Sequence, residues 1–362
     1  MGQIRKGLGR LARRAGASAP RVWSRGDVAM QPYRGYGSAS RAFVIGRVFR
    51  QGSVTPAKGA SDIRRQLRDV RRRLLRRSVE GATVRGVLFG TEVVAQTDAD
   101  GYFRLEWRIE TPPVDPGRWA EARLTLEGPV HIEASVEVYI APPTARYAVI
   151  SDIDDTVMKT GVANKLLMAW RLFVEDADDR TAFPGVATLY RALHAGTGGD
   201  EGNPMLYVSR APWGLYDVLD EFFHRQDIPG GPILFLREWG VTWRKPFPRK
   251  AEDHKRALID AIMETYADLP FVLIGDSGQH DPEVYRDVVD RHGGRVRAIY
   301  IRDVKGAASR AQDRAILSEA VAAAGSEMIV AADTLAMAEH AARIGLIAPE
   351  AIDAVRERQP EG

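Results

Sequence analysis

Two carboxylates follow a short apolar run near the middle of the chain, in the string Asp152-Ile153-Asp154-Asp155-Thr156. The run itself, residues 147–150, has the length and β-branched content of a buried strand. Residues two apart on a strand share a face, so Asp152 and Asp154 can converge on one bound group at the strand end. Aspartates at strand-to-loop junctions also make turns, and that simpler interpretation of the string stays open.

A second apolar run, residues 205–208, leads to Ser209 and Arg210. A helical pattern begins at Trp213, preceded by a proline, so the N-terminus of a helix with unpaired N–H groups is expected here. Such a turn can bind an anion of the size of phosphate. Equally, Ser209 could simply cap the helix.

A third apolar run, residues 271–274, leads to Asp276, and Asp281 follows five positions later. Like charges gathered at one edge of a sheet need a counter-ion. Mg²⁺ is expected, because it accepts a few carboxylates together with substrate phosphate. Lys255, near the start of a helical segment, could supply further positive charge. The chain has no cysteine, which excludes thiolate catalysis, disulfides and cysteine-bound metals.

The elements that must position these residues alternate along the chain between short apolar runs and helical segments. This alternation predicts a Rossmann-like, doubly wound parallel sheet with its chemistry at the carboxyl ends of the strands. The catalytic domain is assigned to residues 144–350 and a tail to 351–362. The expected strands are 147–150, 205–208, 271–274, 296–301 and 328–331, and the expected helices are 186–194, 213–225, 252–266, 281–292 and 334–344.

The N-terminal part of the chain has a different pattern. Residues 1–40 are basic and lack periodicity, which predicts a mobile arm. Residues 41–143 alternate apolar and polar side chains, which predicts a small antiparallel β-sandwich with a hairpin turn at Asp98–Gly101. The expected strands lie near 42–49, 83–89, 92–97, 103–109 and 130–140.

Residues 61–78, inside this β region, predict a basic amphipathic helix. It could be a solvated helix packed on the sandwich. Alternatively it binds an anionic membrane, where each basic side chain near the headgroups contributes ~1 kcal/mol. Nucleic acid is not expected, because no aromatic residues are interleaved with the arginines. The membrane-binding candidates are Arg64, Arg65, Arg68, Arg71 and Arg72.

Taken in chain order, the motifs resemble those of the haloacid dehalogenase superfamily over most of residues 146–302. These motifs are strand-Asp-x-Asp-x-Thr, strand-Ser, helix-Lys and strand-Gly-Asp. More narrowly, several segments look like those of the actin patch protein branch of this superfamily. They are 149–156, 207–209, Pro212-Trp213, His254-Lys255, 274–281 and the hairpin at 98–103. That branch comprises Mg²⁺-dependent phosphatidate phosphatases. The pair Arg210-Ala211 departs from the small polar residues expected there, which leaves the choice of substrate open.

The resemblance implies a role for each motif residue. Asp152 would be the nucleophile, and Asp154 would protonate the leaving alkoxide and then activate water. The metal would be held by the Asp152 and Asp276 side chains and the Asp154 carbonyl, with Asp281 and Thr156 around this set. Substrate phosphate would be bound by Ser209, Arg210 and Lys255.

The expected reaction is the hydrolysis of phosphatidate to diacylglycerol through an aspartyl-phosphate. The apolar helix expected at 164–175 would be either core or a lid that meets acyl chains. Two alternatives stay open: a phosphatase for a soluble phosphomonoester, and a non-enzymatic adaptor that binds phosphate or a membrane. Without a spanning segment or a secretion signal, the expected location is the cytoplasm, at a membrane surface if the substrate is a lipid. No protein partner is indicated.

Overall fold

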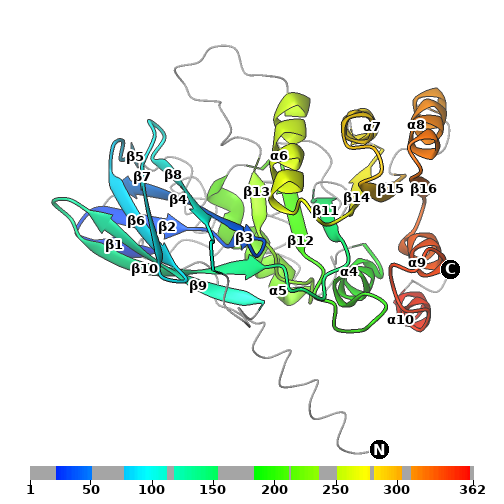
Figure 1. Cartoon of the computed structure of the whole chain (residues 1–362), viewed down its shortest axis with the longest axis horizontal. Coiled ribbons are helices and arrows are strands. Elements are labelled where there is room, and N and C mark those ends of the chain that lie inside the picture. The colour runs from blue at the N-terminus through cyan, green and yellow to red at the C-terminus, as the bar shows by residue number, and fades with distance from the viewer. Residues whose placement is uncertain are drawn as a thin grey trace, which may run out of the picture.

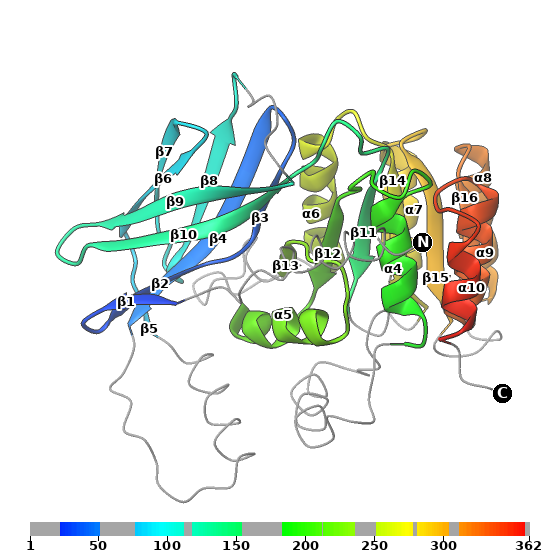
Figure 2. The same cartoon turned by 90° about the horizontal axis from the view of Figure 1, so that it is seen from below.

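The computed structural model describes residues 22–50, 77–111, 118–153, 183–211, 213–235, 251–277, 281–303 and 311–358. They form two sheets that lie side by side (Figures 1 and 2). The first has ten strands, almost all antiparallel, and the second has six parallel strands. The N-terminal sheet abuts the parallel sheet at the side of β12 and β13.

The N-terminal strands form one continuous hydrogen-bonded sheet. Its path runs β1-β2-β4-β3-β10-β9-β6-β7, and β4 also pairs with β5 and β8. All pairings are antiparallel except that of β3 with β10. The strands are β1 Trp23–Arg25, β2 Val28–Pro32, β3 Gly35–Gly37, β4 Arg41–Arg50, β5 Arg77–Ser78, β6 Thr83–Leu88, β7 Thr91–Gln96, β8 Tyr102–Arg108, β9 Trp119–Glu127 and β10 Ile132–Ile140.

Alternation of side chains gives this sheet its own core. Along β8, Phe103, Leu105 and Trp107 are buried, and the residues between them are partly or fully exposed. The turn expected at 98–101 is confirmed: Gly101 has φ +79°, and the Asp98 carboxylate accepts hydrogen bonds from two backbone N–H groups. The expected hairpin is wrong, because β7 before the turn pairs with β6 and β8 after it pairs with β4.

The interpretation of residues 1–40 as a mobile arm is wrong for residues 23–37, which form β1, β2 and β3. Their strands are only three to five residues long and are joined by two-residue connections, so they show no periodicity, yet Met30, Tyr33 and Tyr36 are buried. Residues 1–21 lie outside the described part of the chain.

Two other N-terminal boundaries also differ from prediction. The helix expected over 61–78 cannot include its last two residues, because Arg77 and Ser78 pair with β4 as strand β5. The rest of that segment lies outside the described residues. Strand β9 was not predicted, because two of its four inward positions are Ala120 and Ala122, which weaken the apolar signal.

The second sheet is parallel, as predicted, with strand order β13-β12-β11-β14-β15-β16. The chain starts in the middle and builds outward in one direction and then in the other, which is the order of classic doubly wound sheets. The strands are β11 Ala148–Asp152, β12 Met205–Ser209, β13 Ile233–Phe235, β14 Phe271–Asp276, β15 Val296–Arg302 and β16 Glu327–Ala331.

Helices cover both faces of this sheet. In Figure 1, α6, α7 and α8 lie along one face and α4, α9 and α10 along the other. The helix expected at 213–225 begins as the 3₁₀ turn η1, Trp213–Leu215. The α-helices are α4 Val186–Ala195, α5 Tyr216–Arg225, α6 Ala251–Thr265, α7 Asp281–Arg291, α8 Ala311–Ala323, α9 Thr334–Arg343 and α10 Ala351–Arg356.

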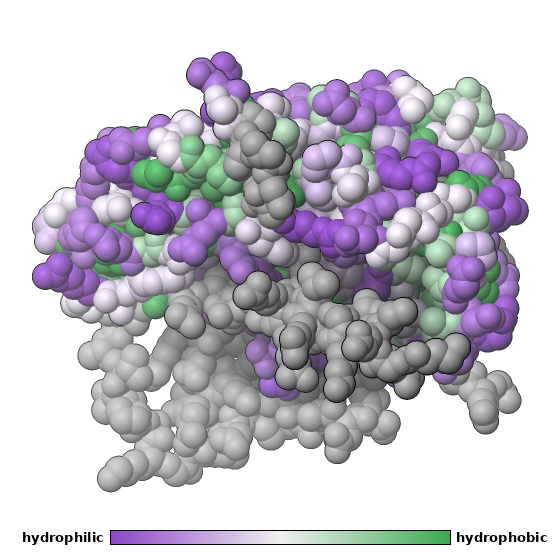
Figure 3. All heavy atoms as spheres, turned by 60° about the horizontal axis from the view of Figure 1, so that its bottom comes forward, coloured by the Kyte–Doolittle hydropathy of each residue, from purple (hydrophilic) through white to green (hydrophobic). Residues whose placement is uncertain are grey.

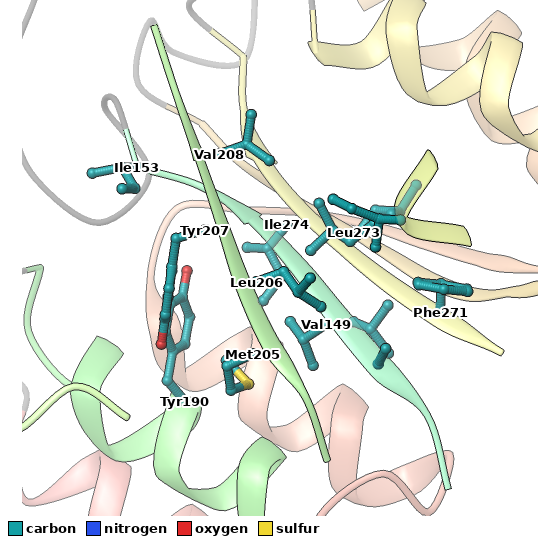
Figure 4. Close-up of a cluster of buried hydrophobic side chains, with 14 of the residues drawn as sticks. Val149, Ile153, Tyr190, Met205, Leu206, Tyr207, Val208, Phe271, Leu273 and Ile274 are labelled. Atoms are coloured by element: carbon teal, nitrogen blue, oxygen red, sulfur yellow. The ribbon is translucent and has the colours of Figure 1, made fainter. Parts of the chain in front are cut away.

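The central strands of the parallel sheet are buried on both faces. Figure 4 shows Leu206 and Leu273, which lie in register with Ile150 on the two strands that flank β11, and Val149, which lies in register with Met205 and faces the other side of the sheet. Continuous apolar strands of this kind are expected when helices cover both faces. The result is a rigid platform under the last residues of these strands.

The expected tail at 351–362 is also wrong in part. Residues 351–356 form α10, whose Val355 is fully buried near Gly185 at the start of α4. This apolar contact closes the end of the domain built on the parallel sheet, so the described part of that domain extends to residue 358.

The described surface mixes polar and apolar residues (Figure 3). Within the described residues, the large apolar side chains that are clearly exposed are Val94 and Val330. No helix among these residues is long and apolar enough to cross a membrane.

Candidate active site

Strands β11 and β14 lie side by side in the centre of the parallel sheet. From β11 the chain adds strands on one side, and from β14 it adds them on the other. Crevices at the carboxyl ends of such strands are where doubly wound sheets bind ligands. The last residues of these two strands are Asp152 and Asp276, so the ladder extends one or two residues beyond the apolar runs and includes the aspartates. The fold thus brings together two residues that are 124 positions apart in the sequence.

Three carboxylates meet at this point. Asp152, Asp276 and Asp281 are all fully buried. One carboxylate oxygen from each lies within 4.8 Å of the others. Asp281 is the first residue of α7, and the dipole at the N-terminus of a helix favours a negative charge there.

Lys255 joins two of these carboxylates. Its Nζ donates to Asp152 Oδ1 at 2.7 Å and to Asp281 Oδ1 at 2.5 Å, and the lysine side chain is fully buried. Burial alone would lower the pKa of Lys255, but the two carboxylates outweigh it and raise the pKa above its usual value. The ammonium group therefore stays charged. Three carboxylates and one ammonium leave two excess negative charges in this group of four.

Asp281 has both oxygens engaged in orienting its neighbours. Oδ1 accepts from Lys255, and Oδ2 accepts from the backbone N–H of Asp276 at 3.2 Å. One Asp281 oxygen still lies within 4.8 Å of an oxygen of Asp152 and of Asp276, so its place outside the ligand set stays a prediction. Its carboxylate fixes the positions of Lys255 and of the end of β14.

Gly275 leaves room for the Asp281 carboxylate. A Cβ at position 275 would lie 2.3 Å from Asp281 Oδ2 and 2.9 Å from the Tyr285 ring. We expect Gly275→Ala to push Asp281 away from Lys255, lowering kcat/KM at least about tenfold and the free energy of unfolding by about 1–3 kcal/mol. Steady-state kinetics and urea denaturation measure both effects.

Gly293→Ala is the matched control for that substitution. Gly293 is exposed, and the nearest atom to a Cβ there is at an ordinary contact distance of 3.7 Å. We expect this variant to match the wild-type protein in both measurements. Equal behaviour of the two variants would contradict the role given to Gly275.

Ser209 ends β12, beside β11, at the same edge of the sheet. It is fully buried, and its Oγ accepts a hydrogen bond from the N–H of Ala211 at 3.0 Å. Arg210 follows and is partly exposed. The expectation that these two residues lie at the edge that carries Asp152 is confirmed.

Two further groups near this edge were not predicted. Ser151 Oγ donates to the carbonyl of Asp152 at 2.9 Å and lies 2.6 Å from the Tyr190 hydroxyl. Arg302 ends β15 in register with Asp276, is buried, and lies 4.1 Å from the Phe183 ring. Each follows an expected strand, and Ser151 also lies in the segment 149–156 that carries the resemblance, but neither was given a role.

Some predicted site residues lie outside the described part of the chain. They are Asp154 and Thr156, and with them the helix expected at 164–175 and the arginines Arg64, Arg65, Arg68, Arg71 and Arg72. Asp154 follows Ile153, whose N–H donates to the Val208 carbonyl at 2.9 Å. The described chain therefore leads directly from the site towards Asp154.

Comparison with known proteins identifies a related class for this region. Residues 147–303 match a family model described as "Phosphatidate phosphatase APP1, catalytic domain". The match begins just before β11 and ends just after β15, so it includes the site residues Asp152, Ser209, Lys255, Asp276 and Asp281. It supports an enzyme, and specifically a phosphoric monoester hydrolase.

The chain is similar to "Phosphatidate phosphatase APP1" of Saccharomyces cerevisiae, with 29% identity over 208 residues, which is 56% of this chain and 34% of that protein. It is also 25% identical over 224 residues to an uncharacterized protein of Schizosaccharomyces pombe, covering 60% of this chain and 36% of the relative. The chain thus spans about a third of the length of the curated relatives it matches.

Among solved structures, a carbohydrate acetylesterase from Xanthomonas citri aligns with a TM-score of 0.25 at 11% identity. The alignment covers 74% of this chain and 66% of that one. A score this low does not indicate a shared fold.

Proposed function

We propose that this chain is a Mg²⁺-dependent phosphatase that hydrolyses phosphatidate to diacylglycerol through an aspartyl-phosphate on Asp152. The main support for the proposal is the buried group of Asp152, Asp276, Asp281 and Lys255 at the carboxyl ends of β11 and β14. This group lies inside the region that matches a phosphatase catalytic domain. Each member of this group has a role in the reaction.

The first step transfers the phosphoryl group to the enzyme. An Asp152 carboxylate oxygen attacks phosphorus, the new O–P bond forms, and the bond from phosphorus to the leaving alkoxide breaks with its electron pair on that oxygen. Asp154 gives the alkoxide its proton. Lys255 keeps Asp152 ionised beforehand, because its ammonium lies 2.7 Å from Oδ1.

The second step releases phosphate. Asp154, now a carboxylate, takes a proton from water as that water attacks phosphorus, and the acyl-phosphate O–P bond breaks to restore Asp152. The Ser209 hydroxyl and the Lys255 ammonium stabilise the charge on the phosphoryl oxygens in both steps. Inorganic phosphate then leaves.

The chemistry of the donor set suits Mg²⁺. Buried carboxylate oxygens within 4.8 Å of one another, with two excess negative charges, favour a hard divalent cation over an empty site. The cation would be held by the Asp152 and Asp276 side chains and the Asp154 carbonyl, and when bound it neutralises charge on the phosphate oxygens. In this proposal Asp281 acts from outside the ligand set, where its two oxygens position Lys255 and the end of β14.

Membership in the haloacid dehalogenase superfamily is part of the proposal. The support is the order of the parallel strands and the positions of four motifs: aspartate at the end of β11, serine at the end of β12, lysine early in α6 and aspartate at the end of β14. The N-terminal sheet encloses a separate apolar core, which agrees with a β-sandwich ahead of the catalytic domain.

Phosphatidate is proposed as substrate because the matched family model and the Saccharomyces cerevisiae relative are both described as phosphatidate phosphatase. The arginine-rich residues 61–76 would add attraction to an anionic bilayer, holding the enzyme peripherally at the cytoplasmic face. A soluble phosphomonoester would need the same catalytic residues, so the substrate must be decided by assay.

The test is phosphate release from phosphatidate in mixed micelles and from a soluble phosphomonoester, each with Mg²⁺ and with excess EDTA. We expect turnover of the lipid that EDTA abolishes and added Mg²⁺ restores, and that falls as ionic strength screens the arginines. Turnover of the soluble ester alone would keep the catalytic assignment and remove the lipid. No turnover of either, with binding to anionic vesicles, would favour an adaptor.

A further inference from the structure

The N-terminal sheet contacts the catalytic domain at the helical segment that follows Ser209. The Tyr33 ring lies 4.0 Å from that of Trp213 and 4.7 Å from that of Tyr216, measured between centroids. The next residue, Arg34, donates its backbone N–H to the Tyr216 hydroxyl at 3.2 Å. All these aromatic side chains are buried, so the contact excludes water.

Polar contacts extend the same interface along the helix. Gln31 Nε2 donates to Asp217 Oδ1 at 2.9 Å. The Arg34 guanidinium forms an ion pair with Asp220, and both side chains are at most 10% exposed. The helical partners of residues 31–34 are therefore 213, 216, 217 and 220, which is the spacing of one helix face.

A second part of the N-terminal sheet contacts the same tryptophan. Tyr102 follows the turn at 98–101, and its ring lies 6.2 Å from that of Trp213. Trp213 also packs edge-on against Phe235 at the end of β13, at 4.6 Å. Tyr102, which is partly buried, and the buried Trp213 are thus brought together although they are far apart in the sequence.

Trp213 lies close to the proposed phosphate-binding residue. Ser209 Oγ accepts a hydrogen bond from the N–H of Ala211, and Trp213 lies two residues after Ala211 in the sequence. The turn between the end of β12 and η1 is therefore held at Ser209 by the sheet and at Trp213 by the N-terminal domain. We therefore expect a shift of the Trp213 ring to displace the turn, and with it Arg210, the residue next to Ser209.

We propose that Tyr33, together with Gln31 and Arg34, positions the phosphate-binding turn that follows Ser209. The N-terminal sheet would then contribute to the binding of phosphate at the active site. This inference rests on the proposed function for the role of Ser209. It assigns the N-terminal sheet a purpose within the reaction, in addition to any contact it makes with a membrane.

The test compares Tyr33→Leu with Tyr139→Phe in the full chain. Tyr33→Leu keeps apolar bulk but removes the ring contacts. Tyr139→Phe removes another buried contact between the two domains, the 2.7 Å hydrogen bond to the Gly202 carbonyl, which lies towards the opposite end of β12. Both variants weaken the interface, and only the first touches the segment that leads to Ser209.

For the substrate that the wild-type enzyme turns over, we expect Tyr33→Leu to raise KM, and Ki for inorganic phosphate, about tenfold. It should also lower kcat about tenfold, because Ser209 stabilises the phosphoryl oxygens during the reaction as well. The Mg²⁺ activation constant should stay unchanged, and Tyr139→Phe should keep all four values. If Tyr33→Leu does not fold, Gln31→Leu should raise Ki about threefold. Equal Ki values in the Tyr33 or Gln31 variant and in Tyr139→Phe would overturn the proposal.

Hydrogen exchange separates failure of this inference from failure of the proposed function. If the wild-type protein neither hydrolyses a phosphomonoester nor binds phosphate, the proposed function fails. Peptides covering 209–216 should still exchange faster in Tyr33→Leu than in Tyr139→Phe. Equal exchange in the two variants would show that the N-terminal sheet does not hold this turn.

Discussion

Asp152→Asn should abolish phosphate release, lowering kcat on the order of 10⁴-fold or more, because the amide cannot form an acyl-phosphate. The shape of the side chain is kept. The substitution loses one ion pair with Lys255 but also removes one of three clustered carboxylates. We therefore expect the free energy of unfolding, measured in EDTA, to stay within about 1 kcal/mol of the wild-type value.

Asp260→Asn is the matched control for that substitution. Asp260 lies in α6, in the same helix as Lys255, but is partly exposed and pairs with Arg291 and His292. Its variant should keep wild-type kcat and KM. Residual turnover by Asp152→Asn above about 1% of the wild-type rate, in protein free of deamidated material, would argue against a nucleophilic Asp152.

Lys255→Met should damage both activity and stability. Removing the ammonium takes away the ion-pair partner that Asp152 and Asp281 share, and breaking a buried ion pair typically costs about 3–5 kcal/mol. Loss of a positive charge aimed at the phosphoryl oxygens should lower kcat by about 10²–10³-fold. Urea denaturation in EDTA, followed by circular dichroism, measures the first effect without a cation to offset it.

Arg256→Met serves as the control at the neighbouring position. Arg256 pairs with Asp253 and Asp287 but is about one quarter exposed, with a side-chain accessibility of 28%. Ion pairs at that exposure contribute about 0–1 kcal/mol, so stability and rate should change little. A Lys255→Met protein as stable as Arg256→Met would mean that the ammonium does not neutralise the buried carboxylates.

The parallel sheet and its site residues could be predicted from sequence because several independent signals agree there. Apolar runs of strand length each end in a polar residue, and each run became a central strand buried on both faces. The short edge strand β13 and the helices α8 and α10 were not predicted. Strand β13 has only three residues, and the positions of α10 are decided by packing of Val355 against α4 and α9.

The N-terminal sheet was harder to predict, because its early strands depend on contacts distant in sequence. Tyr33 is buried largely by residues that lie 180 or more positions later, and no local pattern encodes that contact. For the same reason Gly275 was noted only as part of the strand-Gly-Asp motif, since its need for space comes from Asp281 on a different element. The sequence predicted residues for the proposed chemistry, but not the contacts of Tyr33 and Gly275 with distant elements.

The most direct test of the account is to trap the phosphoenzyme during turnover. Borohydride reduces an aspartyl-phosphate to homoserine, which mass spectrometry of peptides can locate. With substrate and Mg²⁺ present, the account predicts homoserine at position 152, and none when substrate is omitted or in Asp152→Asn. Recovery of homoserine at another aspartate instead, in protein that is turning over substrate, would contradict it.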